Sequence, residues 1–154
     1  MESLLAALEA SAAAHALRQS VWLYPLANVL HVLGAMGFFA AVAAMDVKAL
    51  GRSPAADVRN FIGRLRPVAI AFFLVQLVTG IMLFLPEATH IARNVVFLVK
   101  VGTILLAVLN VVLLEAALAR RPAAATPPGV RLAAAASIVL WLGVATLGRL
   151  IAYF

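Results

Sequence analysis

Long apolar runs alternate with short polar segments along the chain, and this pattern predicts its helices. A helix needs about 20 mostly apolar residues to cross a bilayer. The first two of the runs that meet this requirement contain no acidic residue, lysine or arginine, and the last two contain one basic residue each, Lys100 and Arg149. The pattern therefore predicts an all-α integral membrane four-helix bundle. Its spans cover residues 21–45, 67–86, 95–114 and 132–154.

Two shorter amphipathic segments lie outside these spans. Over residues 3–18, apolar side chains recur on one helical face, which predicts a short surface helix before the first span. After the first span, Ser53 and Pro54 form a helix start, because serine caps a first turn and proline is tolerated in it. Apolar and basic residues then follow a helical pattern, so we expect a basic amphipathic helix in this loop, before the span that begins at Pro67.

Composition supports the membrane assignment. The chain is 66% hydrophobic and 12% charged, whereas a soluble domain is about 45–50% apolar and about 25% charged. A soluble monomer or a disordered chain is therefore excluded, and the length fits a single membrane domain over residues 1–154. The absence of cysteine excludes disulfide scaffolds, thiolate metal sites and cysteine nucleophiles.

The basic residues predict an orientation. Only Arg18 and Arg93 lie outside the spans on the side of the termini. The loops on the opposite side carry Lys48, Arg52, Arg59, Arg64, Arg66, Arg120, Arg121 and Arg131. By the positive-inside rule, both termini lie outside and the basic loops lie in the cytoplasm. In a chain this apolar, the net charge of +6 indicates topology and contact with the lipid bilayer, so no nucleic-acid partner is expected.

Polar residues inside the spans gather toward the predicted outer side. Counting from the outer helix ends places one polar residue from each span at similar depth: Asn28, Thr79, Thr103 and Thr146. His31 and Gln76 lie somewhat deeper, and Lys100 and Arg149 lie nearer the surface. We therefore expect a polar pocket in the outer half of the bundle. Its candidate binding residues are His31, Tyr24, Asn28, Gln76, Lys100 and Arg149.

His31 is the strongest functional candidate of this set, because a side chain at the bilayer centre cannot reach water and needs a partner within the membrane. It is a candidate haem or copper ligand, or a proton-handling group beside a quinone. The alternative is a neutral histidine that is hydrogen-bonded to a neighbouring helix. Lys100 and Arg149 would neutralise carboxylate or phosphate groups of a ligand, or else extend toward lipid headgroups.

The remaining histidines restrict these possibilities. The other two, His15 and His90, lie outside the spans, so a single chain offers no pair of membrane histidines for bis-histidine haem. The methionines Met36, Met45 and Met82 are scattered in depth and form no copper cluster with His31. No nucleophilic triad or phosphate loop is present, so an enzyme acting alone is not expected.

Other residues in or near the spans have structural interpretations. Asp46 and Glu115 are predicted to form interfacial ion pairs with nearby basic residues. Trp141 is predicted to pack in the bundle, with its N–H seeking a partner. Six glycines are predicted to mark close approaches between helices: Gly34, Gly37, Gly80, Gly102, Gly143 and Gly148.

Several motifs resemble a known family. They are Val21-Trp-Leu-Tyr-Pro, Leu30-His-Val-Leu-Gly, Met45-Asp-Val-Lys-Ala-Leu-Gly, Leu77-Val-Thr-Gly, Arg93-Asn, Lys100 and Trp141-Leu-Gly with Gly148-Arg-Leu-Ile-Ala-Tyr-Phe. Together they resemble a bacterial domain-of-unknown-function family of small four-span inner-membrane proteins. More distantly, the second and third spans resemble the membrane domain of copper-resistance D-type proteins. The resemblance implies four helices in the bacterial inner membrane and supplies no activity.

Three functions follow as expectations. The first is a small membrane subunit whose outer-half pocket binds a redox-active or anionic ligand (haem b, quinone or copper) and takes part in electron transfer. The second is a structural or assembly subunit that anchors a membrane or periplasmic partner and binds no cofactor. The third is a small transporter. In each case the chain would work as a homo-oligomer or as a subunit of a larger membrane complex.

Overall fold

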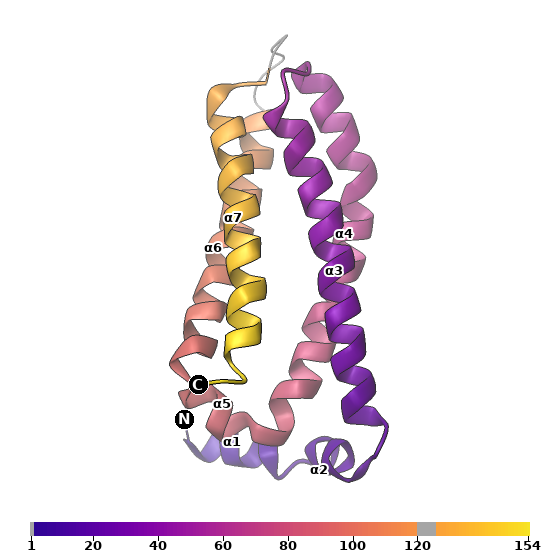
Figure 1. The fold of residues 1–154 in the computed structure, drawn as a ribbon, viewed down its shortest axis with the longest axis vertical. Coiled ribbons are helices and arrows are strands. Elements are labelled where there is room, and N and C mark those ends of the chain that lie inside the picture. The colour runs from indigo at the N-terminus through magenta and orange to yellow at the C-terminus, as the bar shows by residue number, and fades with distance from the viewer. Residues whose placement is uncertain (1, 120–125) are drawn as a thin grey trace.

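A computed structural model describes residues 2–119 and 126–154. Its described part is helical without strands, so the predicted all-α class is confirmed (Figure 1). Arg120 and Arg121, two of the basic residues from which the orientation is predicted, lie outside the described residues. The long helices are apolar enough to cross a membrane, as a multi-pass membrane protein requires. They are α3 (Leu23–Leu50), α4 (Ala55–Phe84), α6 (Val95–Ala119) and α7 (Pro128–Leu150).

The observed helices are longer than the predicted spans at one end of the bundle, because polar residues extend them beyond the apolar runs. The expected loop helix and second span form the single helix α4, which continues through Pro67. Proline cannot supply the N–H that would bond the carbonyl of Gly63. The apolar face that contains the buried residues Val58, Ile62 and Ala69 nevertheless runs on both sides of this position, so packing maintains the helix.

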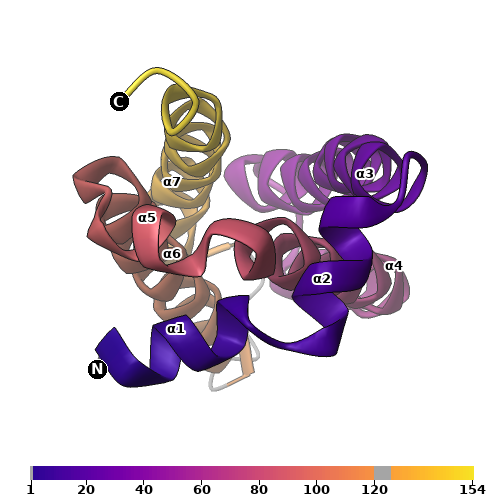
Figure 2. The same cartoon turned by 90° about the horizontal axis from the view of Figure 1, so that it is seen from below.

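The short elements all lie at one end of the bundle, which also contains both chain termini (Figures 1 and 2). We call it the capped end and the opposite end, which carries the basic loops, the basic end. The predicted surface helix is two helices, because the Ser11 side chain accepts a hydrogen bond from the Ala14 N–H and starts a new helix. The elements are α1 (Glu2–Glu9), α2 (Ala12–Gln19), the 3₁₀ helix η1 (Leu85–Glu87) and α5 (Ala88–Arg93).

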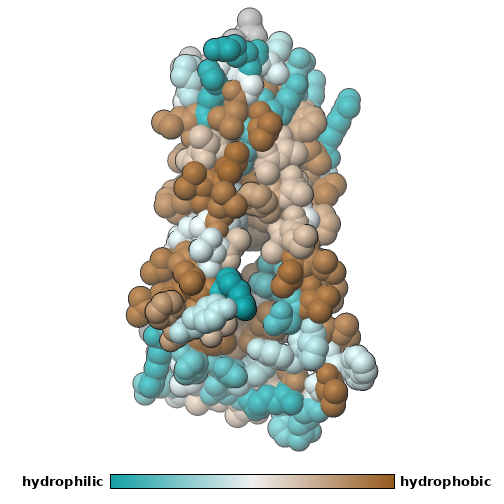
Figure 3. Space-filling model, in the orientation of Figure 1, coloured by the Kyte–Doolittle hydropathy of each residue, from teal (hydrophilic) through white to brown (hydrophobic). Residues whose placement is uncertain are grey.

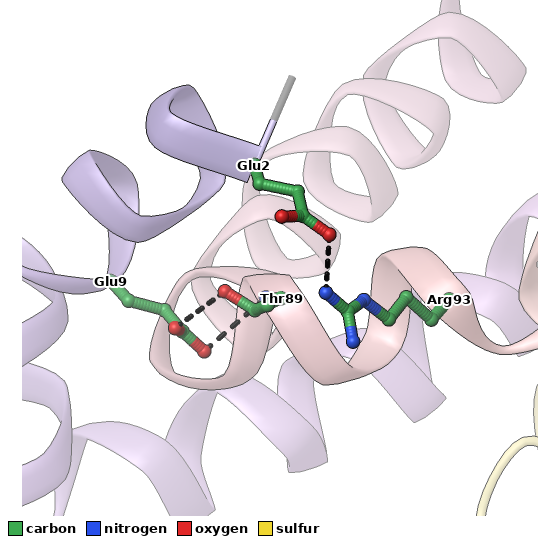
Figure 4. Close-up of polar contacts among 4 residues, drawn as sticks. All are labelled: Glu2, Glu9, Thr89 and Arg93. Carbon is green, nitrogen blue, oxygen red and sulfur yellow. Dashed lines mark hydrogen bonds and ion pairs between the residues drawn. The ribbon is translucent and has the colours of Figure 1, made fainter.

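Polar bonds hold α1 and α2, together called the N-terminal strap, against η1 and α5 (Figure 4). The Glu9 carboxylate accepts hydrogen bonds from the Thr89 hydroxyl at 2.7 Å and from the Thr89 backbone N–H at 3.3 Å. Arg93 forms an ion pair with Glu2 at 2.5 Å. Arg18 donates to the carbonyls of Pro86 and Glu9, at 3.0 and 2.7 Å. The strap therefore closes the capped end through hydrogen bonds and charge.

The four long helices form two hairpins, α3–α4 and α6–α7, which meet mainly where α3 packs against α7. Helices α4 and α6 scarcely touch. At the basic end, one buried cluster draws on all four helices: Ala49, Ala55, Val58, Ile62, Leu114, Leu118, Val130 and Ala134. Arg131 also donates to the Leu50 carbonyl at 3.0 Å. The hairpins are thus joined firmly at the basic end, and they diverge toward the capped end (Figure 1).

Candidate functional site

The site begins with His31 on α3, which is half-buried in the part of the bundle where the hairpins diverge. Its Nδ1 atom lies 2.8 Å from the Oγ1 atom of Thr79, a buried residue of α4. The Thr79 hydroxyl also lies 2.6 Å from the Val75 carbonyl oxygen, one helical turn earlier. These two contacts fix the imidazole ring against α4.

The same contacts favour one position for the proton on the His31 ring. A threonine hydroxyl has one proton and can also accept hydrogen bonds. With the Thr79 proton donated to the Val75 carbonyl at 2.6 Å, the hydroxyl accepts at His31, and Nδ1 carries the imidazole proton in this arrangement. In neutral His31, Nε2 then holds a lone pair. Among residues 2–119 and 126–154, no hydrogen-bond partner satisfies Nε2, which leaves it available to a proton donor or a metal.

Gln76 supports the backbone of His31 from the neighbouring helix. Its side-chain Nε2 donates a hydrogen bond to the His31 carbonyl oxygen. Gly34 permits this close approach, and Gly80 lies beside the His31 ring. A Cβ atom on Gly34 would lie 2.7 Å from Gln76 Nε2, and one on Gly80 would lie 3.4 Å from His31 Cε1. The predicted close approach at Gly34 is confirmed, whereas the distance at Gly80 is that of an ordinary van der Waals contact.

Lys100 brings a positive charge from the other hairpin. Its half-buried side chain crosses from α6 to α7, where a Cβ atom on Gly148 would lie 3.3 Å from Nζ. The lysine is near enough for its charge to act on His31. Figure 3 shows hydrophilic side chains around a hollow between the hairpins in the lower half of the molecule. The site thus combines a polar cluster on one hairpin with a cation on the other.

The other three candidate residues lie outside this group. Tyr24 and Asn28 are exposed on α3. Arg149 is also exposed, and it donates to the Tyr153 hydroxyl at 2.8 Å while its guanidinium lies 5.0 Å from that ring's centroid. The described contacts therefore join His31 and Gln76 directly, without Tyr24, Asn28 or Arg149, and Lys100 acts on His31 only through its charge.

The polar pocket that was expected to draw on all four helices also contains fewer residues than predicted. Thr103 and Thr146 donate to carbonyls four residues earlier in their own helices, at 2.8 and 2.9 Å. Of Thr79, Thr103 and Thr146, only Thr79 has a hydroxyl that contacts a residue of another helix. Its role as the partner of His31 was not predicted, although it lies three residues after Gln76 and therefore shares a face of α4 with it.

Metal ligands are few around His31. Within residues 2–119 and 126–154, no group of three or more histidine, cysteine or acidic side chains is placed to hold a metal ion. A metal at this site would therefore have His31 and at most one further protein ligand of those types among the described residues. This donor set would suit a haem iron better than an all-protein copper site.

Comparisons with protein-family models, with curated proteins and with solved structures found no match. The resemblance to a family of small four-span inner-membrane proteins therefore stays a prediction.

Proposed function

We propose that this chain is a membrane subunit that binds a lipid-soluble redox ligand of the quinone class beside His31. One observation carries the proposal: His31 Nδ1 is fixed by Thr79, which leaves the Nε2 lone pair available within the membrane-spanning part of the bundle. A quinol hydroxyl can donate its proton to that lone pair. Lys100 offers a hydrogen-bond donor and a positive charge from the facing hairpin.

The architecture supports a ligand that arrives through the lipid. Helices α4 and α6 scarcely touch, so the two hairpins leave a lateral path between them. The surrounding helix faces are apolar, which suits a hydrophobic ring and tail. Oxidation of a bound quinol requires an electron acceptor, which would come from a partner subunit. The proposal is therefore a binding subunit of a larger complex, with the capped end on the outer side of the bacterial inner membrane.

Haem b is a second candidate, and the same hydrogen bond favours it. A histidine that ligates a metal usually donates its other ring N–H to an oxygen acceptor, which fixes the tautomer and the ring orientation. Thr79 serves His31 in this way. Lys100 would then pair with a haem propionate. Any further iron ligand would be a water, another side chain or a histidine of a second chain.

One purification separates these candidates. The chain is purified from membranes in a mild detergent, extracted with organic solvent, and assayed by chromatography for quinones and by visible spectroscopy for haem. We expect a quinone in near-stoichiometric amount, and its loss in His31→Gln. His90→Gln is the matched control, because His90 is exposed on α5.

Three other results would overturn the quinone assignment. A Soret band that disappears in His31→Gln would identify haem instead. Quinone retained equally by His31→Gln and His90→Gln would show that it is carried by lipid and not by the site. A colourless, quinone-free protein that co-purifies with a partner would support the structural or assembly subunit.

A further inference from the structure

A cavity of about 230 Å³ with an almost wholly apolar lining lies toward the basic end of the bundle. For comparison, an apolar cavity of about 150 Å³ holds a benzene molecule. The cavity lies between the hairpins, and its walls come from all four long helices. Most of its lining is aliphatic, including Val42, Ile62 and Val111. It therefore has room for the apolar part of a small organic molecule.

The buried polar groups at this cavity are not satisfied by the protein. Asp46 is 5% exposed and Trp141 is 6% exposed, and both line the cavity. Asp46 Oδ2 and Trp141 Nε1 have no hydrogen-bond partner within the geometric limits in the described part of the chain, and Ser137 lies beside the Asp46 carboxyl group. Asp46 was predicted to form an interfacial ion pair, and that prediction is wrong within residues 2–119 and 126–154.

The nearby charges do not neutralise Asp46. Glu115 forms its predicted ion pair, with Arg66 at 2.9 Å, and both residues line the cavity. This pair is partly exposed where α4 and α6 scarcely touch, so it marks the side of the cavity toward the lipid. Because its charges cancel, Asp46 gives the cavity an unpaired acidic group. A buried carboxylate without an ion-pair partner is costly, and a bound cation would offset that cost.

Three aromatic rings complete the chemistry. Phe38 and Phe73 lie beside Trp141, with ring centroids 4.6 and 6.4 Å from it, and all three rings line the cavity. Aromatic rings attract organic ammonium groups through their negative faces. A carboxylate next to aromatic rings in an apolar cavity is therefore suited to an ammonium head that carries a hydrocarbon body.

We infer that the Asp46 cavity binds an amphiphilic organic amine, with its ammonium group at Asp46 and its hydrocarbon part along the aliphatic wall toward the gap between α4 and α6. This site is separate from the His31 site and requires no ligand there. The amine would enter laterally from the bilayer beside the Arg66–Glu115 pair. Binding forms an ion pair and breaks no covalent bond.

The test uses three probes with the same hydrocarbon chain: octylamine, octanol and octanoate. The protein is purified in a maltoside detergent with Trp22→Phe, so that Trp141 is its one tryptophan and its emission reports on the cavity. We expect octylamine to bind at least about tenfold more tightly than octanol, and octanoate to bind least. Equal binding of octylamine and octanol would overturn the inference.

Variants in the same background assign the effect to the cavity. Asp46→Asn should abolish the preference for octylamine, whereas Asp57→Asn, at an exposed position of α4, should retain it. If Asp46→Asn fails to fold, Val111→Phe fills the cavity from α6 and leaves Asp46 in place, and it should weaken octylamine binding. A preference that survives Asp46→Asn, or unchanged octylamine binding in Val111→Phe, would contradict the inference.

Discussion

At the scale of single residues, the sequence indicated which positions matter in the His31 site but not how they connect. Counting residues along the apolar runs predicted similar depths in the membrane for His31, Gln76 and Thr79. The direction of each hydroxyl and amide depends on helix rotation, which residue counting does not fix. For this reason Thr79 was not recognised as the partner of His31, and Arg149 was expected in a pocket that it does not join.

The Thr79 hydrogen bond should be measurable in stability. Thr79→Val keeps the shape of the side chain but leaves His31 Nδ1–H without its acceptor. Because an unsatisfied buried donor costs about 1–3 kcal/mol, we expect the free energy of unfolding to fall by about that amount in a detergent titration. Thr79→Ser keeps the hydroxyl and should lose clearly less. Equal losses in both variants would mean that the methyl group, and not the hydrogen bond, matters.

At the scale of elements, the apolar runs predicted the long helices well because hydrophobic length determines a membrane span. The ends of the helices were predicted less well. Polar residues continue a helix beyond the hydrocarbon, and Pro67 did not end α4 because its buried face runs past it. The glycines predicted to mark close helix contacts do so only in part. A Cβ atom on Gly34 or Gly37 would meet side chains of α4, whereas one on Gly102 or Gly143 would meet open space.

The contact between α3 and α4 can be tested at Gly34. Gly34→Ala places a Cβ atom 2.7 Å from Gln76 Nε2 and 3.1 Å from Val75 Cγ1, so the Gln76 side chain must leave the His31 carbonyl. We expect a loss of about 1–3 kcal/mol in the free energy of unfolding. Gly143→Ala meets nothing within 4 Å and should be neutral or stabilising by up to about 1 kcal/mol. Similar effects of the two substitutions would contradict the described packing.

The N-terminal strap should loosen in acid. The Thr89 hydroxyl, with help from the Thr89 backbone N–H and the charge of Arg18, holds the pKa of Glu9 below its ordinary value of 4.5. A lowered pKa means that the stabilisation is fully present above pH 4.5 and is lost as the pH falls through the lower folded-state value. The protection factors of the strap amides, which compare the measured exchange with the intrinsic rate at each pH, should therefore fall below pH 4.5.

Glu9→Gln should remove most of this pH dependence, because glutamine does not titrate. Glu87→Gln changes an exposed carboxylate at the same end and should leave it intact. If Glu9→Gln and the unmodified chain respond to acid alike, another group controls the strap.

At the scale of the whole molecule, the order of helices followed from the sequence, but the unequal joining of the two hairpins did not. Contacts between helices depend on which small residues meet across an interface, and a single sequence does not state these pairings. The basic end is closed by a shared apolar cluster, whereas the capped half diverges and is covered by the strap. This asymmetry places the His31 site in the open half and the Asp46 cavity in the closed half.

The predicted orientation is open to a labelling experiment. The chain has no cysteine, so single cysteines can be introduced at Ser3 in the strap and at Ala56 near the basic end. In intact bacterial cells, a membrane-impermeant maleimide should label Ser3→Cys and should label Ala56→Cys only after lysis. The reverse result would place the basic end outside and contradict the positive-inside prediction.

The most direct measurement of the His31 site is nitrogen-15 NMR of the chain labelled on histidine, with His31→Gln used to assign the His31 signals. For neutral His31 without ligand, we expect a protonated Nδ1 and an unprotonated Nε2. Addition of a soluble short-tail quinol should shift the Nε2 signal and leave the Nδ1 proton in place. A protonated Nε2 in the neutral ring, or an Nε2 signal that does not respond to the quinol, would contradict the proposed function.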